Sequence, residues 1–391
     1  MKPRDSVPGP KARRDIFIVC NNIEELGGLQ RWAHHTAGLL AGQGHDVHLV
    51  GIVHPNEPHD FKPGHSYRTS VLYDVHPPSA WSPKRLRDHA NVPARVRETR
   101  RREEAHEVAD RLTEMFRAAR PGAIVIVPQV WAMEWVALAD TTGLRVIGMS
   151  HESFEASKAS SRFARVQRYF SDVDRLLLLT REDAEAWARA GMNNTGALPN
   201  PLPIDPTTSS DRRHKVVVSL GRFSYEKGYD LLLEAWGEIA PKHPDWKLRL
   251  YGGGSEDAAL RAQALRLGVA GSVEFPGPTA DVEGALREGA IFALSSRAEG
   301  FPMSLLEAMS MGIPCVAFDC APGVREIISH ENNGLLVARG NTESFAGAVR
   351  TLMADAELRD RLGEQALKDV QRYAPSSILQ RWEQLFEFVY R

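Results

Sequence analysis

The chain has 391 residues, of which 43% are hydrophobic and 25% charged, as is ordinary for a soluble globular protein of two or three domains. Its 48 Lys and Arg residues balance 50 Asp and Glu residues, so no net basic field favours nucleic acid as a partner. No apolar run reaches the roughly 18–20 residues that span a bilayer, and three cysteines are too few for a disulfide framework. Residues 1–14 are predicted to form a flexible tail and not a secretory signal. We therefore expect a cytoplasmic protein.

The first half of the chain alternates short apolar runs with amphipathic segments of helix length, which is typical of parallel α/β architecture. Strands are predicted at residues 15–20, 47–53, 123–127, 145–149 and 175–179. The first of them is followed by a turn at Gly27 and Gly28 and by a helix over residues 29–41. Residues 55–93 are rich in proline and lack a clear period, so this segment is predicted to leave the sheet as irregular chain.

A proline-rich linker divides the chain into two halves of similar size. Four prolines fall within residues 198–206, a density that neither a helix nor a central strand tolerates. Beyond it, strands are predicted at residues 214–220, 247–251, 272–275, 290–294 and 313–318. Helices are predicted at residues 228–240, 256–267 and from 342 to about 390, with an interruption near Pro375. We expect domains at residues 15–199 and 210–375 with a cleft between them, where ligands bind preferentially.

Two cations follow the first strand of the second domain. Arg222 and Lys227 lie on the loop that leaves this strand and opens the next helix. Fixed cations together with helix N–H groups form a site for a diphosphate. Taken alone, the same pair is equally typical of a solvated surface.

Two acids follow another strand of the second domain, in the segment Glu299-Gly-Phe-Pro-Met-Ser-Leu-Leu-Glu307. Pro302 near the start of the predicted helix needs no N–H donor, so the surrounding backbone amides point towards the cleft. Two carboxylates placed in this way accept hydrogen bonds from separate hydroxyl groups of an elongated ligand such as a sugar or a ribose. For either acid alone, a helix-start or exposed mid-helix position is the simpler interpretation.

These motifs resemble those of family 4 retaining glycosyltransferases with the GT-B fold, in which two Rossmann-like domains face each other across a cleft. The resemblance extends over nearly the whole chain. Its motifs are Gly27-Gly28-Leu-Gln-Arg31, His151, Pro199-Asn-Pro201, Gly221-Arg222 to Lys227-Gly228, Tyr251-Gly-Gly-Gly254, Phe275-Pro-Gly277, Glu299 to Glu307, and Ala317 to Gly323.

The resemblance implies a role for each matched residue of the second domain. Arg222 and Lys227 would bind the nucleotide diphosphate, Glu307 the ribose hydroxyls and Glu299 the hydroxyls of the transferred sugar. The backbone around the donor would be completed by Gly300, Phe301, Pro302, Met303 and Ser304, with Phe275 lining the base. Residues 376–391 would form a helix that packs back onto the first domain.

On the first-domain side, Gly27 and Gly28 can approach a phosphate or acceptor closely, although a Gly pair alone is more typical of a helix-entry turn. A Gly-x-Gly-x-x-Gly fingerprint is absent, which disfavours a nicotinamide dehydrogenase. His151 follows a predicted strand directly, where side chains point into the ligand crevice. It matches the family's active-site histidine, and we expect it to position substrate or stabilise charge. Glu152 and Trp131 are weaker acceptor-side candidates.

Two further features have competing interpretations. Asp172-Val-Asp174 has the form of a metal motif, but it precedes a strand at the amino edge, so we expect no metal and a polar turn. Arg222 and Lys227 would supply the charge neutralisation that Mg²⁺ gives elsewhere. The stretch from Lys84 to Arg102 contains eight basic residues and two acids. It fits either a site that docks on the anionic inner face of a membrane or a solvated helix with intrahelical partners.

The sequence therefore predicts a retaining, metal-independent glycosyltransferase that moves a hexose from a nucleotide diphosphate sugar, with UDP as the favoured nucleotide, to an acceptor hydroxyl. Glycans, lipid-linked glycans and small molecules are all candidate acceptors. Two alternatives remain at this stage: a GT-B-type sugar-nucleotide epimerase or phosphorylase, and a sugar-nucleotide-binding subunit without turnover.

Overall fold

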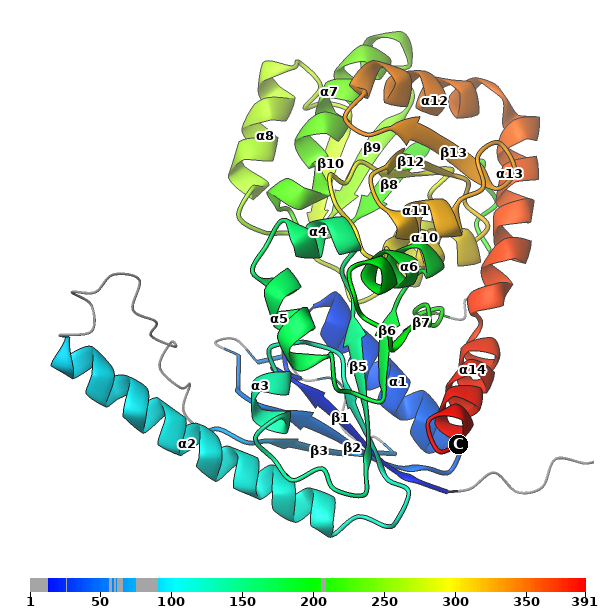
Figure 1. Ribbon diagram of the computed structural model, residues 1–391. Coiled ribbons are helices and arrows are strands. Elements are labelled where there is room, and N and C mark those ends of the chain that lie inside the picture. The colour runs from blue at the N-terminus through cyan, green and yellow to red at the C-terminus, as the bar shows by residue number, and fades with distance from the viewer. Residues whose placement is uncertain are drawn as a thin grey trace, which may run out of the picture.

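The computed structural model describes residues 13–25, 27–55, 58, 59, 61, 66–74, 91–204 and 209–391. They form two parallel β-sheets, each between layers of helices, one above the other in Figure 1. Buried apolar clusters lie on both faces of each sheet. The predicted class, α/β with two Rossmann-like domains, is confirmed.

The first sheet has seven parallel strands in the order β3-β2-β1-β4-β5-β6-β7. Their bounds are β1 Asp15–Cys20, β2 Asp46–Gly51, β3 Arg68–Val71, β4 Ile124–Val127, β5 Arg145–Ser150, β6 Arg175–Leu178 and β7 Thr195–Ala197. The chain proceeds outwards from β1 on one side and from β4 on the other. In open parallel sheets ligands bind beyond the carboxyl ends of the strands where the order reverses, which here are β1 and β4.

The second sheet has six parallel strands in the order β10-β9-β8-β11-β12-β13. Their bounds are β8 Val216–Leu220, β9 Lys247–Tyr251, β10 Val273–Gly277, β11 Ile291–Leu294, β12 Cys315–Asp319 and β13 Gly334–Ala338. Its switch point lies between β8 and β11. The loops after these strands carry Arg222 and Lys227 after β8 and Glu299 after β11, so the topology brings the predicted donor-side residues to one edge.

Helices connect the strands and cover both sheets. In the first half they are α1 Gly28–Gly42, α2 Val92–Arg117, α3 Met133–Val136, α4 Phe154–Lys158, α5 Arg162–Tyr169 and α6 Arg181–Arg189. In the second half they are α7 Tyr229–Ile239, α8 Asp257–Arg266, α9 Val282–Arg287, α10 Met303–Ser310, α11 Pro322–Ile327, α12 Thr342–Ala354, α13 Ala356–Asp369 and α14 Pro375–Phe388. Short 3₁₀ turns are η2 Tyr225–Lys227, η3 Ala240–Lys242 and η4 Val370–Tyr373. Among the helices of the described ranges, none is both long and apolar enough to cross a membrane.

Three strands were not predicted from the sequence, namely β3, β7 and β13. β3 lies within the segment that was predicted to be irregular, and β7 is a three-residue strand with a glycine at its centre. The helical stretch predicted from residue 342 is interrupted before Pro375 as expected, but it also breaks at Asp355, which was not predicted. The Asp355 side chain accepts a hydrogen bond from the Leu358 amide at 2.9 Å and so caps a new helix there.

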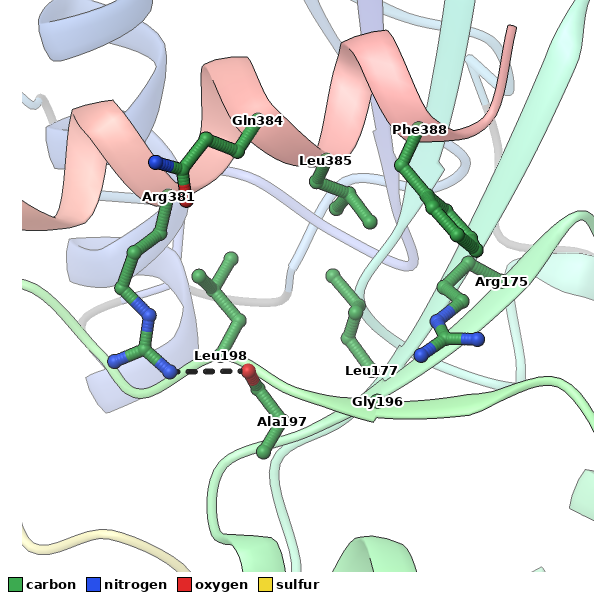
Figure 2. Close-up of a pocket in the computed structure, with 9 residues that line it drawn as sticks. All are labelled: Arg175, Leu177, Gly196, Ala197, Leu198, Arg381, Gln384, Leu385 and Phe388. Carbon is green, nitrogen blue, oxygen red and sulfur yellow. Dashed lines mark hydrogen bonds between the residues drawn. The ribbon is translucent and has the colours of Figure 1, made fainter. Parts of the chain in front are cut away.

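The last helix, α14, leaves the second domain and packs against the first sheet beside α1 (Figure 1). The Tyr390 hydroxyl donates to the Ala123 carbonyl at 2.7 Å, and Arg381 donates to the Ala197 carbonyl at 3.2 Å. Figure 2 shows the shallow pocket of about 260 Å³ that this helix forms with β6 and β7. There the Phe388 ring lies over the Arg175 guanidinium, 5.1 Å away. This pocket is separate from the predicted cleft residues.

Several predicted features lie wholly or partly outside the described residues: the tail up to residue 12, the linker at residues 205–208 and the start of the basic stretch up to residue 90. The described part of that stretch is on α2, where Arg101 and Arg102 pair with Glu98 at 3.2 and 3.1 Å. Arg100 lies 3.5 Å from Glu104. Intrahelical pairing therefore accounts for part of its charge.

Candidate functional site

The loop after β8 is locked against the loop after β11 by a close backbone contact. Gly228 has φ 63°, and a Cβ atom there would lie 2.2 Å from the Ser295 carbonyl oxygen. Only glycine combines this conformation with so close an approach. The Ser295 hydroxyl donates to the Lys227 carbonyl at 3.2 Å, which holds the two loops in register.

Lys227 and Glu299, predicted from separate motifs, are in direct contact. The Lys227 ammonium donates to a carboxylate oxygen of Glu299 at 2.7 Å, and the Ser296 hydroxyl donates to the same oxygen at 2.6 Å. The Glu299 side chain is only 7% exposed, so its charge requires these partners. Arg222 is exposed at the start of the same loop, and no hydrogen-bonded side-chain partner is found for its guanidinium among the described residues.

Backbone contact joins this loop to the first domain. A Cβ atom on Gly300 would lie 1.9 Å from the His151 carbonyl oxygen, so residue 300 must be glycine for the domains to meet here. The turn that places Glu299 in the cleft is therefore the same turn that touches the end of β5. This contact brings His151 next to the acidic motif.

His151 is neutral in this environment. Its ring packs edge-on against Trp32 at a centroid distance of 4.6 Å, and burial lowers the pKa of its imidazole to about 3. Its Nε2 atom is buried without a hydrogen-bond partner in the described structure. A neutral imidazole with a free nitrogen can donate or accept one hydrogen bond from a ligand, which suits positioning more than proton transfer at neutral pH.

Glu307 lies within α10 and is almost fully buried. The helix begins at Met303 after Pro302, and its first backbone hydrogen bond runs from the Leu305 amide to the Pro302 carbonyl at 3.1 Å, so the amides of Met303 and Ser304 precede the hydrogen-bonded turns. Burial raises the pKa of the Glu307 carboxyl, and the nearby Arg31 guanidinium partly offsets that rise. Arg31 donates a hydrogen bond to Glu307 from the first turn of α1, across the boundary between the domains.

The sequence interpretation gave Arg31 no role. A signal was present, because Arg31 ends the Gly-Gly-Leu-Gln-Arg motif and lies one helical turn after Gly28. Gly27 has extended backbone and caps α1, and no atom lies within 4 Å of where a Gly28 Cβ would be. The amino end of α1 thus faces open space beside the Arg31–Glu307 pair.

The other candidates have different surroundings. Arg165 lies over the Trp131 ring at 3.9 Å, and Arg162 pairs with Glu152 at 2.9 Å. The second carboxylate oxygen of Glu152 is buried without a partner, and burial raises the pKa of this carboxyl. Its Cα lies 3.4 Å from the Cβ position of Gly300, so Glu152 adjoins the site, whereas the described contacts of Trp131 do not reach it.

Phe275 and Asp174 lie at the margins. Phe275 is half-buried on β10, with its ring 6.2 Å from that of Phe223 and the Arg261 guanidinium 4.6 Å away. Asp174 accepts hydrogen bonds from the Val146 amide at 2.7 Å and from Arg145 at 3.1 Å. Its carboxylate therefore supports the amino end of β5 on the opposite edge of the sheet from the cleft.

Comparisons with known proteins agree with this geometry. Residues 204–369 match the profile of the family described as glycosyl transferases group 1. The chain is 26% identical over 373 residues to an uncharacterized glycosyltransferase of Haemophilus influenzae, covering 94% of this chain and 98% of that protein. The chain is a glycosyltransferase. It is also 29% identical over 249 residues to the amylovoran biosynthesis glycosyltransferase AmsD of Erwinia amylovora, covering 62% of this chain and 70% of AmsD.

Solved structures share the fold of this glycosyltransferase. TarM of S. aureus, in a complex that includes UDP, superposes with a TM-score of 0.77 at 15% identity, covering 95% of this chain and 99% of TarM. HepE of Anabaena in complex with UDP gives a TM-score of 0.74 at 18% identity, covering 96% of this chain and 99% of HepE. The GT-B arrangement of the glycosyltransferase is thus shown, and its group 1 segment contains the loops after β8 and β11.

Proposed function

We propose that this glycosyltransferase moves a hexose from a uridine diphosphate sugar to a hydroxyl of a glycan, lipid-linked glycan or small molecule, with retention at the anomeric carbon. The observation that carries the proposal is the Lys227–Glu299 contact. It unites a cation suited to a diphosphate with an acid suited to sugar hydroxyls. The UDP complexes of the structural neighbours support uridine as the base.

Each side chain has a chemical task in this proposal. Lys227 and the exposed Arg222 bind the diphosphate, and Glu299 accepts hydrogen bonds from the transferred sugar. Glu307 accepts hydrogen bonds from the ribose, and the first-turn amides of α10 face the donor. His151 positions the sugar through its free Nε2 atom.

Transfer takes place on one face of the sugar. The acceptor oxygen bonds to the anomeric carbon as the bond from that carbon to the phosphate oxygen breaks. The acceptor proton passes to the departing phosphate, and the nucleoside diphosphate leaves. Lys227 and Arg222 stabilise the charge that develops on this leaving group, so the mechanism needs no metal ion.

A thermal-shift panel of UDP-, GDP- and ADP-sugars tests the donor. A ligand at 100 times its dissociation constant adds about 2.7 kcal/mol to the stability of the folded state, which a melting curve resolves readily. Incubation of the selected donor with an acceptor panel, followed by NMR of the new anomeric proton, tests transfer and retention. Donor binding without acceptor-dependent release of nucleoside diphosphate would contradict the proposed reaction. Loss of that release when EDTA is added would contradict the proposed metal independence.

We further propose peripheral contact of this enzyme with anionic membrane through α2. The helix projects from the first domain (Figure 1), and its first turns combine exposed Val92 and Val96, 62% and 63% accessible, with basic side chains. Each Lys or Arg near an anionic surface contributes about 1 kcal/mol. Co-sedimentation with phosphatidylglycerol vesicles should exceed that with phosphatidylcholine vesicles and fall with salt; equal sedimentation would refute the contact.

A further inference from the structure

Both acids of the candidate donor site are paired with cations in the structure. Lys227 holds Glu299 at 2.7 Å, and Arg31 holds Glu307. A nucleotide sugar carries hydroxyls, which suit the two carboxylates, and a diphosphate, which suits the two cations. Donor binding at this site therefore exchanges partners: each acid gives up a cation and takes hydroxyls.

The Arg31–Glu307 pair differs from the other because it joins opposite domains, through residues 276 positions apart. As in the other pair, the acid is more buried than the cation, here 3% against 35% exposed. The Arg31 guanidinium acts against the effect of burial and lowers the pKa of the Glu307 carboxyl. Arg31 donates to one of the two carboxylate oxygens of Glu307, so a ribose cannot take both oxygens while Arg31 holds this one.

A released Arg31 has an anion-compatible region beside it. Arg31 extends from the first turn of α1, whose amino end is formed by Gly27 and Gly28. No atom of the described residues lies within 4 Å of the position that a Gly28 Cβ atom would take, so the space there is open. A guanidinium donates two parallel hydrogen bonds to a phosphate, and the unpaired first-turn amides of a helix favour the same charge. The Arg31 side chain thus lies between two partners: the Glu307 carboxylate, which it contacts, and the open region over Gly28.

We propose that Arg31 is a donor-responsive positioning residue: it pairs with the ribose-binding carboxylate of Glu307, as in this structure, and moves to the donor diphosphate when a nucleotide sugar binds. The inference rests on the proposed function, since it takes Glu307 as the ribose site. It adds a third cation to the donor site, contributed by the opposite domain. Arg31 thereby makes the arrangement of the two domains depend on whether the site holds a diphosphate.

A nucleoside and its diphosphate separate the two roles. Uridine has the ribose without phosphate, so Arg31→Ala, which frees Glu307, should tighten uridine binding by roughly fivefold. UDP gains the same benefit but loses a charged hydrogen bond, so its advantage over uridine should shrink by at least ~tenfold. Arg31→Gln, which removes the charge but keeps a shorter polar side chain, should give the same signs if the alanine variant is poorly folded.

The experiment measures uridine and UDP affinities by calorimetry for the wild type, Arg31→Ala, Arg31→Gln, Glu307→Gln and the double variant Arg31→Ala/Glu307→Gln. In the Glu307→Gln background, loss of Arg31 should no longer tighten uridine binding, because the gain passes through this carboxylate. The matched control is Glu182→Gln. It removes the Glu182–Arg325 pair of 2.8 Å, which also joins the two domains but touches neither Glu299 nor Glu307.

The outcomes separate this inference from the proposed function. Wild-type protein that binds none of UDP, GDP and ADP overturns both; if GDP or ADP binds in place of UDP, the matching nucleoside replaces uridine. Wild-type binding with an unchanged uridine affinity in the Arg31 variants overturns only the role of Arg31. An equal gain in Glu182→Gln would also overturn it, because the effect would then follow from loosening any interdomain contact.

Discussion

Replacement of Gly300 by alanine tests the contact on which the whole site depends. The added Cβ atom would lie 1.9 Å from the His151 carbonyl oxygen, whereas Cβ contacts shorter than 3.0 Å are essentially never seen. The backbone of the β11 loop or of residue 151 must therefore move by about 1.1 Å, the difference between these distances. Because Glu299 precedes Gly300 directly, the displacement reaches the donor site.

The expected cost falls on turnover. A misplacement of about 1 Å in a catalytic arrangement costs roughly 10²-fold, or about 2.7 kcal/mol of transition-state stabilisation. The assay is kcat/KM from acceptor-dependent release of nucleoside diphosphate, with circular dichroism as the check of folding. Gly42→Ala is the matched control, since that glycine ends α1 and no atom lies within 4 Å of its Cβ position. We expect Gly42→Ala to retain wild-type activity.

A Gly300→Ala enzyme with wild-type kcat/KM would refute this reasoning. The working enzyme would then not hold the β11 loop against the end of β5, and the juxtaposition of His151 with Glu299 would have no catalytic meaning. A fall in melting temperature alone, with unchanged kcat/KM, would lead to the same conclusion.

Three further predictions concern single side chains. Lys227→Ala should lower kcat by about 10²–10³-fold, because the cation that faces the leaving phosphate is lost, and Lys227→Arg should recover part of it in the same product-release assay. Burial holds the pKa of His151 at about 3 when folded against about 6.5 unfolded, so the unfolded chain binds the extra proton and this residue makes the free energy of unfolding decline as pH falls from 6.5 towards 3. Denaturant titrations should show a shallower pH dependence for His151→Asn over that interval, and an identical slope would contradict the burial argument. Tyr390→Phe loses the hydrogen bond to the Ala123 carbonyl and should cost about 1 kcal/mol of stability in urea unfolding with little change in kcat; an unchanged midpoint would show that this bond contributes nothing.

Local pattern was sufficient to predict the architecture. Apolar runs such as the one that became β4 identify buried parallel strands by composition alone, and the residue before and after each run is polar or a turn former. Strands that the sequence pattern did not predict include β7, which has only three residues. β7 is a strand because it pairs with β6, not because its own sequence favours one. Whether a short segment forms a strand depends on the strands that it pairs with, and a single sequence does not show which strands those are.

The same division applies to the site. The proximity of Lys227 and Glu299 could be predicted because both follow strands of one parallel sheet, and the carboxyl ends of parallel strands lie at the same edge. The partner of Glu307 could not, since Arg31 belongs to the other domain and the pairing depends on how the two sheets face each other. Trp131 could not be oriented from sequence either, because its neighbour Arg165, which lies over its ring, comes from a separate helix.

The path of α14 has a consequence for the order in which the protein folds. The first domain includes a buried Trp382 and Phe386 that come from the carboxyl-terminal helix, whereas the second domain is built from a continuous stretch of chain. On the ribosome, the half that is synthesised first therefore remains without part of its interior until residues 375–388 have emerged. Among the described residues, the interior of the second half draws on no segment of the first half in this way, so only the first half has to wait for the carboxyl-terminal helix.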